Sequence, residues 1–163
     1  MKHVLVIALV SYLAYALEFL LYNFWGPWGK PELLVLVVIF FNLYLGIRFS
    51  IIAAICCGIF KDASGVAPFG TYVLVYIAAS YLTTFVRWYL YQPGSRASRA
   101  LVALFVVTGC FIVQAVLTDM NHELHFGEQL LYLLIPQLLT TMIAATYVFA
   151  QLKNISAFFA LKS

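Results

Sequence analysis

Long apolar stretches, separated by short polar or glycine- and proline-rich segments, run along the whole chain. In a chain of this kind each stretch is a candidate transmembrane helix. The pattern predicts helices at about residues 4–22, 31–47, 49–62, 71–89, 100–118 and 129–150. The expected fold is therefore all-α: one integral membrane domain, residues 1–163, built as a polytopic bundle of six transmembrane helices.

Turn-forming sequences mark the limits of these helices. "NFWGPWGK" ends the first, and Pro31 suits the start of the second. "QPGSRASR" separates the fourth from the fifth. The second and third stretches are short for a hydrocarbon core of about 30 Å, so a single broken segment, giving five spans, is the alternative. That alternative draws Arg48 into the membrane, which favours six.

Composition excludes an ordinary soluble domain. Hydrophobic residues make up 65% of the 163 residues and charged residues only 9%, whereas a soluble domain carries roughly 25% charged residues. No basic run is long enough to indicate nucleic-acid binding. The lipid bilayer is therefore the expected surroundings, and at this length one domain is expected.

The basic residues divide unequally between the two sides that six spans define. Only Lys30 and Lys61 fall on one side. The other side holds seven: Lys2, Arg48, Arg87, Arg96, Arg99, Lys153 and Lys162. Basic residues concentrate in the cytoplasm, so both termini are expected there. The first apolar stretch continues past the "AYA" at 14–16, which predicts an uncleaved span.

Groups suited to catalysis or metal binding are few. "DASG" around Ser64 resembles the Gly-x-Ser-Gly of intramembrane serine proteases, but Asp62 replaces the first glycine and every histidine lies outside the predicted spans. A serine nucleophile needs a positioned base. "HELH" at 122–125 lacks the His-Glu-x-x-His frame of zinc proteases and indicates a solvated loop. The three cysteines, Cys56, Cys57 and Cys110, are interpreted as packing residues. No enzymatic activity, cofactor or metal is expected.

Small residues repeat every four positions in the third stretch. They are Ser50, Ala54, Gly58 and Asp62. Small side chains on one face let helix backbones approach closely in lipid, whereas the second stretch, with only large side chains, is expected to face lipid. Asp62 and Gly65 would end the third helix at a tight corner, and Gly70 would permit close approach. Contact with a partner is the other role open to Asp62.

Polar side chains inside the predicted spans are candidates for contacts between helices. Glu18 is the one acidic residue within a span, and such groups usually face protein or water. An interfacial position and a contact with another helix or a partner are both open for Glu18. Gln114 and Gln137, with Thr140 and Thr141, are expected to form interhelical hydrogen bonds.

One segment resembles a known family. "KPELLVLVVIFFNLYLGIRFSIIAAICCGIFKDASGVAPFGTYVLVYIAASYL" is similar to the pattern of MreD, the small polytopic subunit of the bacterial rod-shape complex. In that pattern a proline opens a span, and spaced glycines lead to Gly-x-x-x-Asp, a Ser-Gly pair and a further glycine. The matching positions are Gly46, Gly58, Asp62, Ser64, Gly65 and Gly70.

The resemblance implies a fold like the substrate-binding S-components of energy-coupling factor transporters. It also implies a non-enzymatic scaffold of cell-wall elongation in the bacterial cytoplasmic (inner) membrane. Such a scaffold binds the single-span protein MreC, and through it is linked to MreB, the RodA glycosyltransferase and its partner transpeptidase. The alternative is a substrate-binding subunit of a vitamin or solute transporter, which would need a convergent polar pocket. The few polar side chains in the spans favour the scaffold.

Overall fold

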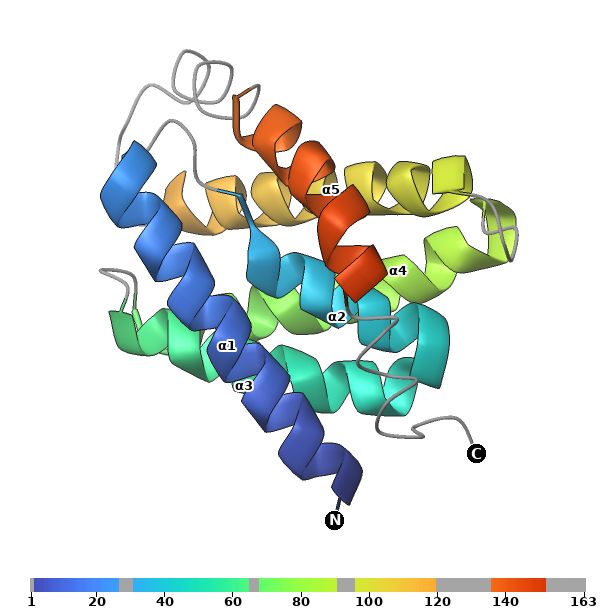
Figure 1. Cartoon of the computed structure of the whole chain (residues 1–163), viewed down its shortest axis with the longest axis horizontal. Coiled ribbons are helices and arrows are strands. Elements are labelled where there is room, and N and C mark those ends of the chain that lie inside the picture. The colour runs from blue at the N-terminus through green and yellow to red at the C-terminus, as the bar shows by residue number, and fades with distance from the viewer. Residues whose placement is uncertain (1, 27–30, 65–67, 91–95, 120–135, 152–163) are drawn as a thin grey trace.

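The structure, a computed structural model, describes residues 2–26, 31–64, 68–90, 96–119 and 136–151, and its regular elements there are all helices (Figure 1). The helices are α1 (Lys2–Trp25), α2 (Leu33–Leu45), α3 (Ile47–Ser64), α4 (Thr71–Leu90) and α5 (Arg96–Asp119), and a sixth covers residues 136–151. The all-α prediction is confirmed for this part of the chain. The start of the predicted sixth helix, 129–135, lies outside the described residues.

Helix α2 lies at the centre of the molecule (Figure 1). All of its residues from Leu33 to Leu43 are buried. It contacts α1, α3, α4 and α5, and the Phe40 ring lies 6.3 Å, between ring centroids, from Phe149 of the sixth helix. The prediction that this stretch faces lipid is therefore wrong. A helix that is apolar on every side can be surrounded by lipid or by protein, and here other helices surround it.

A single glycine separates α2 from α3. Gly46 has φ +90°, a conformation that residues with a side chain rarely adopt. Its N–H donates to the carbonyl of Asn42 at 3.1 Å, and α3 begins at the next residue. The chain then runs back along α2, since Ser50 near the start of α3 donates to the carbonyl of Val38 at 3.1 Å. The predicted stretches 31–47 and 49–62 thus form two separate helices, α2 and α3, while the choice between five and six spans stays a prediction.

Close packing of α3 against α4 depends on Gly58. A Cβ atom added there would lie 2.5 Å from the Cα atom of Val73, so the two backbones touch and no side chain fits between them. Ser50, Ala54 and Asp62, on the same face of α3, are also buried. The predicted small-residue face of the third helix is confirmed.

Among the described residues, two helical segments are long and apolar enough to cross a membrane. They are Val4–Phe24 in α1 and Ala97–Gln114 in α5, and 33% of each segment is buried inside the molecule. Helix α2 is apolar but shorter. These segments allow a membrane location, while the six spans and the cytoplasmic termini stay predictions.

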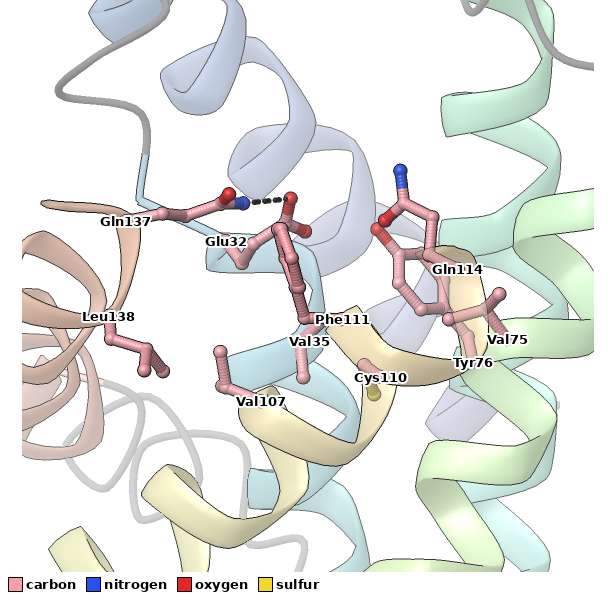
Figure 2. A pocket seen from close by; sticks show the side chains of 10 residues that line it. All are labelled: Glu32, Val35, Val75, Tyr76, Val107, Cys110, Phe111, Gln114, Gln137 and Leu138. Atoms are coloured by element: carbon pink, nitrogen blue, oxygen red, sulfur yellow. Dashed lines mark hydrogen bonds between the residues drawn. The ribbon is translucent and has the colours of Figure 1, made fainter. Parts of the chain in front are cut away.

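A small pocket lies between α2, α4, α5 and the sixth helix (Figure 2). Its polar lining comes from Glu32, Tyr76, Gln114 and Gln137, and the rest is mostly apolar. Its cavity volume is ≈ 10 Å³, which is room for about one water molecule.

Candidate functional site: a buried polar cluster around Lys61

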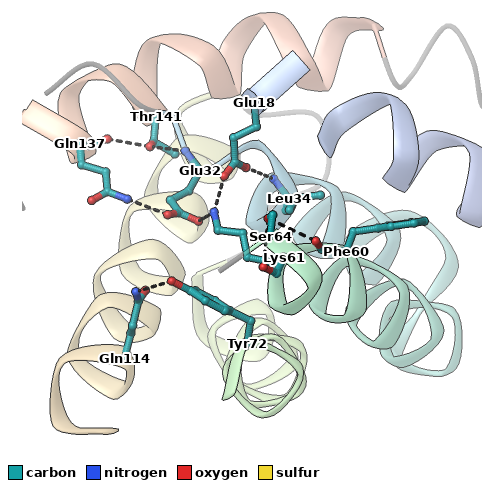
Figure 3. Close-up of polar contacts among 10 residues, drawn as sticks. All are labelled: Glu18, Glu32, Leu34, Phe60, Lys61, Ser64, Tyr72, Gln114, Gln137 and Thr141. Carbon is teal, nitrogen blue, oxygen red and sulfur yellow. Dashed lines mark hydrogen bonds and ion pairs between the residues drawn. The ribbon is translucent and has the colours of Figure 1, made fainter. Parts of the chain in front are cut away.

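Lys61, near the end of α3, lies between two carboxylates (Figure 3). Its Nζ atom donates to Oε1 of Glu18 on α1 and lies 3.5 Å from Oε2 of Glu32, the residue before α2. The exposed fractions of the three side chains are only 7% for Lys61, 3% for Glu18 and 13% for Glu32. Buried charges are tolerated when they are paired and hydrogen-bonded, and these three meet that condition through one another.

Glu18 joins α1 to the start of α2. Its Oε2 atom accepts the N–H of Leu34 at 3.4 Å. The first N–H groups of a helix have no partner within the helix, and negative charge there is favourable. Glu18 therefore makes a contact between helices, which is one of the two roles that the sequence left open for it.

Glu32 joins the start of α2 to the sixth helix. Gln137 donates its Nε2–H to Oε1 of Glu32 at 2.7 Å, and the N–H of Glu32 donates to Oγ1 of Thr141 at 3.1 Å. The interhelical hydrogen bonds predicted for Gln137 and Thr141 are confirmed. Thr140 instead donates to the carbonyl of Pro136 in its own helix, at 3.0 Å.

Tyr72 extends the cluster to α4 and α5. The Lys61 Nζ atom lies 5.6 Å from the centroid of the Tyr72 ring, within the range of a cation–π contact. Gln114 of α5 donates its Nε2–H to the Tyr72 hydroxyl at 3.0 Å, as predicted for an interhelical hydrogen bond. The polar groups around Lys61 thereby connect all six helices at one end of α2.

Asp62 caps α4. Its carboxylate accepts the N–H groups of Gly70 at 2.9 Å, Tyr72 at 3.0 Å and Val73 at 3.4 Å. These donors lie at the first turn of α4, where the helix cannot supply acceptors. Gly70 has φ +101° and provides the conformation that the corner requires. The structure thus shows the corner role that the sequence analysis considered for Asp62.

The residues that match the MreD pattern gather around α3. Gly46 precedes it, Gly58 contacts α4, and Asp62 and Gly70 form the corner between the two helices. The exposed Ser64 donates its hydroxyl to the carbonyl of Lys61 at 3.1 Å. Gly65 lies outside the described residues. The described residues of this pattern therefore lie at the start of α3, at its contact with α4 and at the corner that follows it.

A second set of polar contacts lies at the other end of α2. Asn42 donates from Nδ2 to the carbonyl of Ser80 at 2.8 Å and to Thr84 at 2.9 Å. Arg87 donates to the carbonyl of Asn42 at 3.1 Å, and Arg99 donates to the Tyr44 hydroxyl at 3.2 Å. Arg87 and Arg99 thus lie at the opposite end of α2 from Lys61, as the division of basic residues predicts. Which end faces the cytoplasm stays a prediction.

The ion pairs of Lys61 were not predicted from the sequence: Lys61 was expected at the end of a span on the less basic side, and no ionic partner was named for it or for Glu18. The charges themselves could have predicted these ion pairs, because ionisable groups are costly in an apolar chain and usually pair with one another. Asn42, inside the buried α2, was missed as well.

The cysteines behave as packing residues. Cys57 is buried and lies within hydrogen-bonding distance of Ser11, with 3.3 Å between Sγ and Oγ, and all three cysteines are free thiols. No group of three potential metal ligands occurs within the described residues. The "HELH" segment lies outside them.

The cluster around Lys61 is suited to holding helices together, because its ionic groups bond to one another and to helix ends. Comparisons of the chain with protein-family models, with curated proteins and with solved structures found no match.

Proposed function

We propose that this chain is a non-enzymatic scaffold of the bacterial cytoplasmic membrane, which holds partner proteins through its apolar helix faces. One observation carries the proposal: several ionic and polar side chains are buried, while many large apolar side chains are exposed. Soluble proteins rarely bury charged side chains and rarely expose large continuous apolar surfaces.

The buried ionic residues include Lys61, Glu18 and Asp62, each 5% exposed or less when the whole residue is counted. The exposed apolar groups are large and occur on several helices. Examples are Phe24 (80% exposed), Trp88 (88%) and Ile143 (74%). Extended apolar surface on a protein indicates contact with a membrane or another protein. This distribution supports a chain embedded in lipid, with its polar groups satisfied internally as the hydrocarbon core requires.

The resemblance to MreD suggests the identity of the assembly. The proposed partner is an MreC-like single-span protein, with indirect links to MreB, RodA and its transpeptidase. A single transmembrane helix can pack against an apolar helix face through van der Waals contact. The residues that carry the resemblance stabilise α3 and its corners, which supports a rigid platform rather than a reaction centre.

Co-purification tests the proposal. The tagged chain is extracted in mild detergent from its own cells, and the co-purifying proteins are identified by mass spectrometry. An MreC-like protein in constant proportion to the chain is expected. Recovery of the folded chain without any such protein would contradict the scaffold.

The contacting face can be mapped with single alanine substitutions at exposed apolar side chains. Suitable positions are Leu9 on α1 (48% exposed), Phe85 on α4 (64%) and Phe105 on α5 (51%). Because these side chains are exposed, each variant should keep its thermal stability. Loss of the partner from one variant, with the other two as matched controls, would identify the helix that binds it.

The alternative function is the substrate-binding subunit of a vitamin or solute transporter. The pocket in Figure 2 is the observation in its favour, since Glu32, Gln114 and Gln137 converge there. Its cavity volume of ≈ 10 Å³ is far below the roughly 300–1,000 Å³ of typical ligand pockets. Size therefore favours the scaffold, and a vitamin-sized compound in the co-purified material would favour the transporter.

A further inference from the structure

Tyr76 of α4 has a buried hydroxyl without a hydrogen-bond partner. The residue is 1% exposed, and its hydroxyl is the one fully buried side-chain polar atom among the described residues that makes no hydrogen bond. Buried polar atoms nearly always have a partner, either in the protein or in an ordered water. An unpartnered buried hydroxyl therefore points to a small polar group that binds beside it.

The pocket beside Tyr76 has room for such a group. Its cavity volume of ≈ 10 Å³ matches the space that one water-sized group needs. Figure 2 shows the polar ends of Glu32, Gln114 and Gln137 at one end of this pocket, with the Tyr76 hydroxyl on the same side. Apolar side chains such as Val107 and Leu138 line the remainder.

We propose that this cavity binds one hydroxyl group, from a water molecule or from the end of a larger ligand. The bound group accepts a hydrogen bond from Tyr76 and donates one to the carboxylate of Glu32 or to a glutamine carbonyl. An ammonium ion has no lone pair with which to accept from Tyr76. A second carboxylate would be repelled by Glu32. A hydroxyl meets both requirements within the available volume.

The bound hydroxyl would add Tyr76 to the cluster around Lys61. Glu32 already accepts from Gln137 and pairs with Lys61, so a group that bridges Glu32 and Tyr76 ties the second turn of α4 to the start of α2 and to Gln137 of the sixth helix. Its removal should therefore be detectable as a change in the stability of the whole bundle.

Replacing Tyr76 by phenylalanine gives opposite results with and without a bound hydroxyl. If the hydroxyl is bound, Tyr76→Phe breaks a hydrogen bond and lowers the melting temperature in detergent by a few degrees. If the cavity is empty, the same change removes an unsatisfied polar atom and leaves the melting temperature equal or higher. Tyr81→Phe is the matched control, because Tyr81 is on the same helix and 57% exposed.

A cavity-filling substitution gives an independent test. Val107→Leu should displace the bound group, so it should lower the melting temperature more in the wild-type chain than in the Tyr76→Phe background. Native mass spectrometry of the intact chain then distinguishes the sources: a retained compound that Tyr76→Phe releases is a ligand, and no retained mass means water. Equal effects of Val107→Leu in both backgrounds, or a Tyr76→Phe variant at least as stable as the wild type, would overturn the proposal.

Discussion

Lys61 is held by two carboxylates that come from different parts of the chain. We expect Lys61→Met to lower the free energy of unfolding by about 3–5 kcal/mol, because removing one member of a buried ion pair leaves charge without compensation. Thermal or denaturant unfolding in detergent, followed by circular dichroism, measures the effect. Arg48→Met is the control, since Arg48 is an exposed cation on the same helix.

A double substitution separates charge from packing at this position. Lys61→Met leaves the carboxylates of Glu18 and Glu32 without the ammonium that pairs with them. Adding Glu18→Gln removes one of these two unpaired negative charges. Part of the lost stability should therefore return. A double variant that is less stable than Lys61→Met by the full cost of Glu18→Gln alone would show that the two side chains act independently.

The Asp62 carboxylate accepts three backbone N–H groups at the first turn of α4. We expect Asp62→Ala to lower the free energy of unfolding by about 1–3 kcal/mol, since buried donors lose their acceptor. Asp62→Asn should lie between Asp62→Ala and the wild type, because one amide oxygen can replace Oδ2 at Gly70 and Val73, while the amide nitrogen cannot accept from Tyr72. Melting curves of the three chains give the order. Normal melting of Asp62→Ala with loss of a co-purified partner would make Asp62 an interface residue instead.

Much of this site could be predicted from the residue types alone. The Asp62 corner followed from an aspartate, a glycine and the end of a small-residue face. Gln114 and Gln137 followed from polar side chains in apolar helices. The ion pairs could not be predicted in this way. Glu18, Glu32 and Lys61 come together only when three separate segments of the chain pack, and no local sequence pattern specifies that packing.

Helices α3 and α4 pack with their backbones in contact at Gly58. Glycine-to-alanine substitutions test this contact. In an open helix Gly→Ala is stabilising by about 1 kcal/mol. Gly58→Ala should instead be destabilising, because the new Cβ meets the backbone of Val73 at 2.5 Å. Gly109→Ala is the matched control: its Cβ would meet the end of the flexible Leu82 side chain, which can move. Melting temperatures of the two variants should therefore move in different directions, and equal losses would argue against backbone contact at Gly58.

Because α2 is surrounded by other helices, shortening one of its side chains should lower the free energy of unfolding. Leu34 is 0% exposed, so Leu34→Ala should lower the free energy of unfolding by about 2–5 kcal/mol, as in other buried positions. Exposed Leu9 on α1 supplies the comparison, because Leu9→Ala creates no cavity. Unfolding of both variants in the same detergent measures the difference. A negligible cost for Leu34→Ala would return α2 to the lipid-facing position that its sequence suggested.

Helix boundaries were predictable and helix surroundings were not. Gly46 marks one such boundary, since glycine at positive φ stops a helix locally. The "QPGSRASR" segment was predicted to be a loop, but its last four residues belong to α5, which begins at Arg96. Whether an all-apolar helix such as α2 meets lipid or protein depends on which neighbours cover it. That information lies in residues far away along the chain.

The orientation of the chain in the membrane is a property of the whole molecule. If the chain spans the membrane six times, the seven-to-two division of its basic residues places both termini in the cytoplasm. A reporter that is active only in the cytoplasm, fused after Ser163, should be active, and one that requires export should be silent. The reverse pattern of activity would support five spans.

The position of α2 also has a consequence for biosynthesis. Glu32 and its partner Gln137 are 105 residues apart in the chain. At roughly 5–20 residues per second of synthesis, α2 waits about 5–20 s for the helix that completes its surroundings. During that time the Glu32 carboxylate lacks Gln137, and Phe40 lacks Phe149. A nascent chain released before residue 136 would carry these groups uncovered, which makes it a ready substrate for the chaperones and proteases that inspect new membrane proteins.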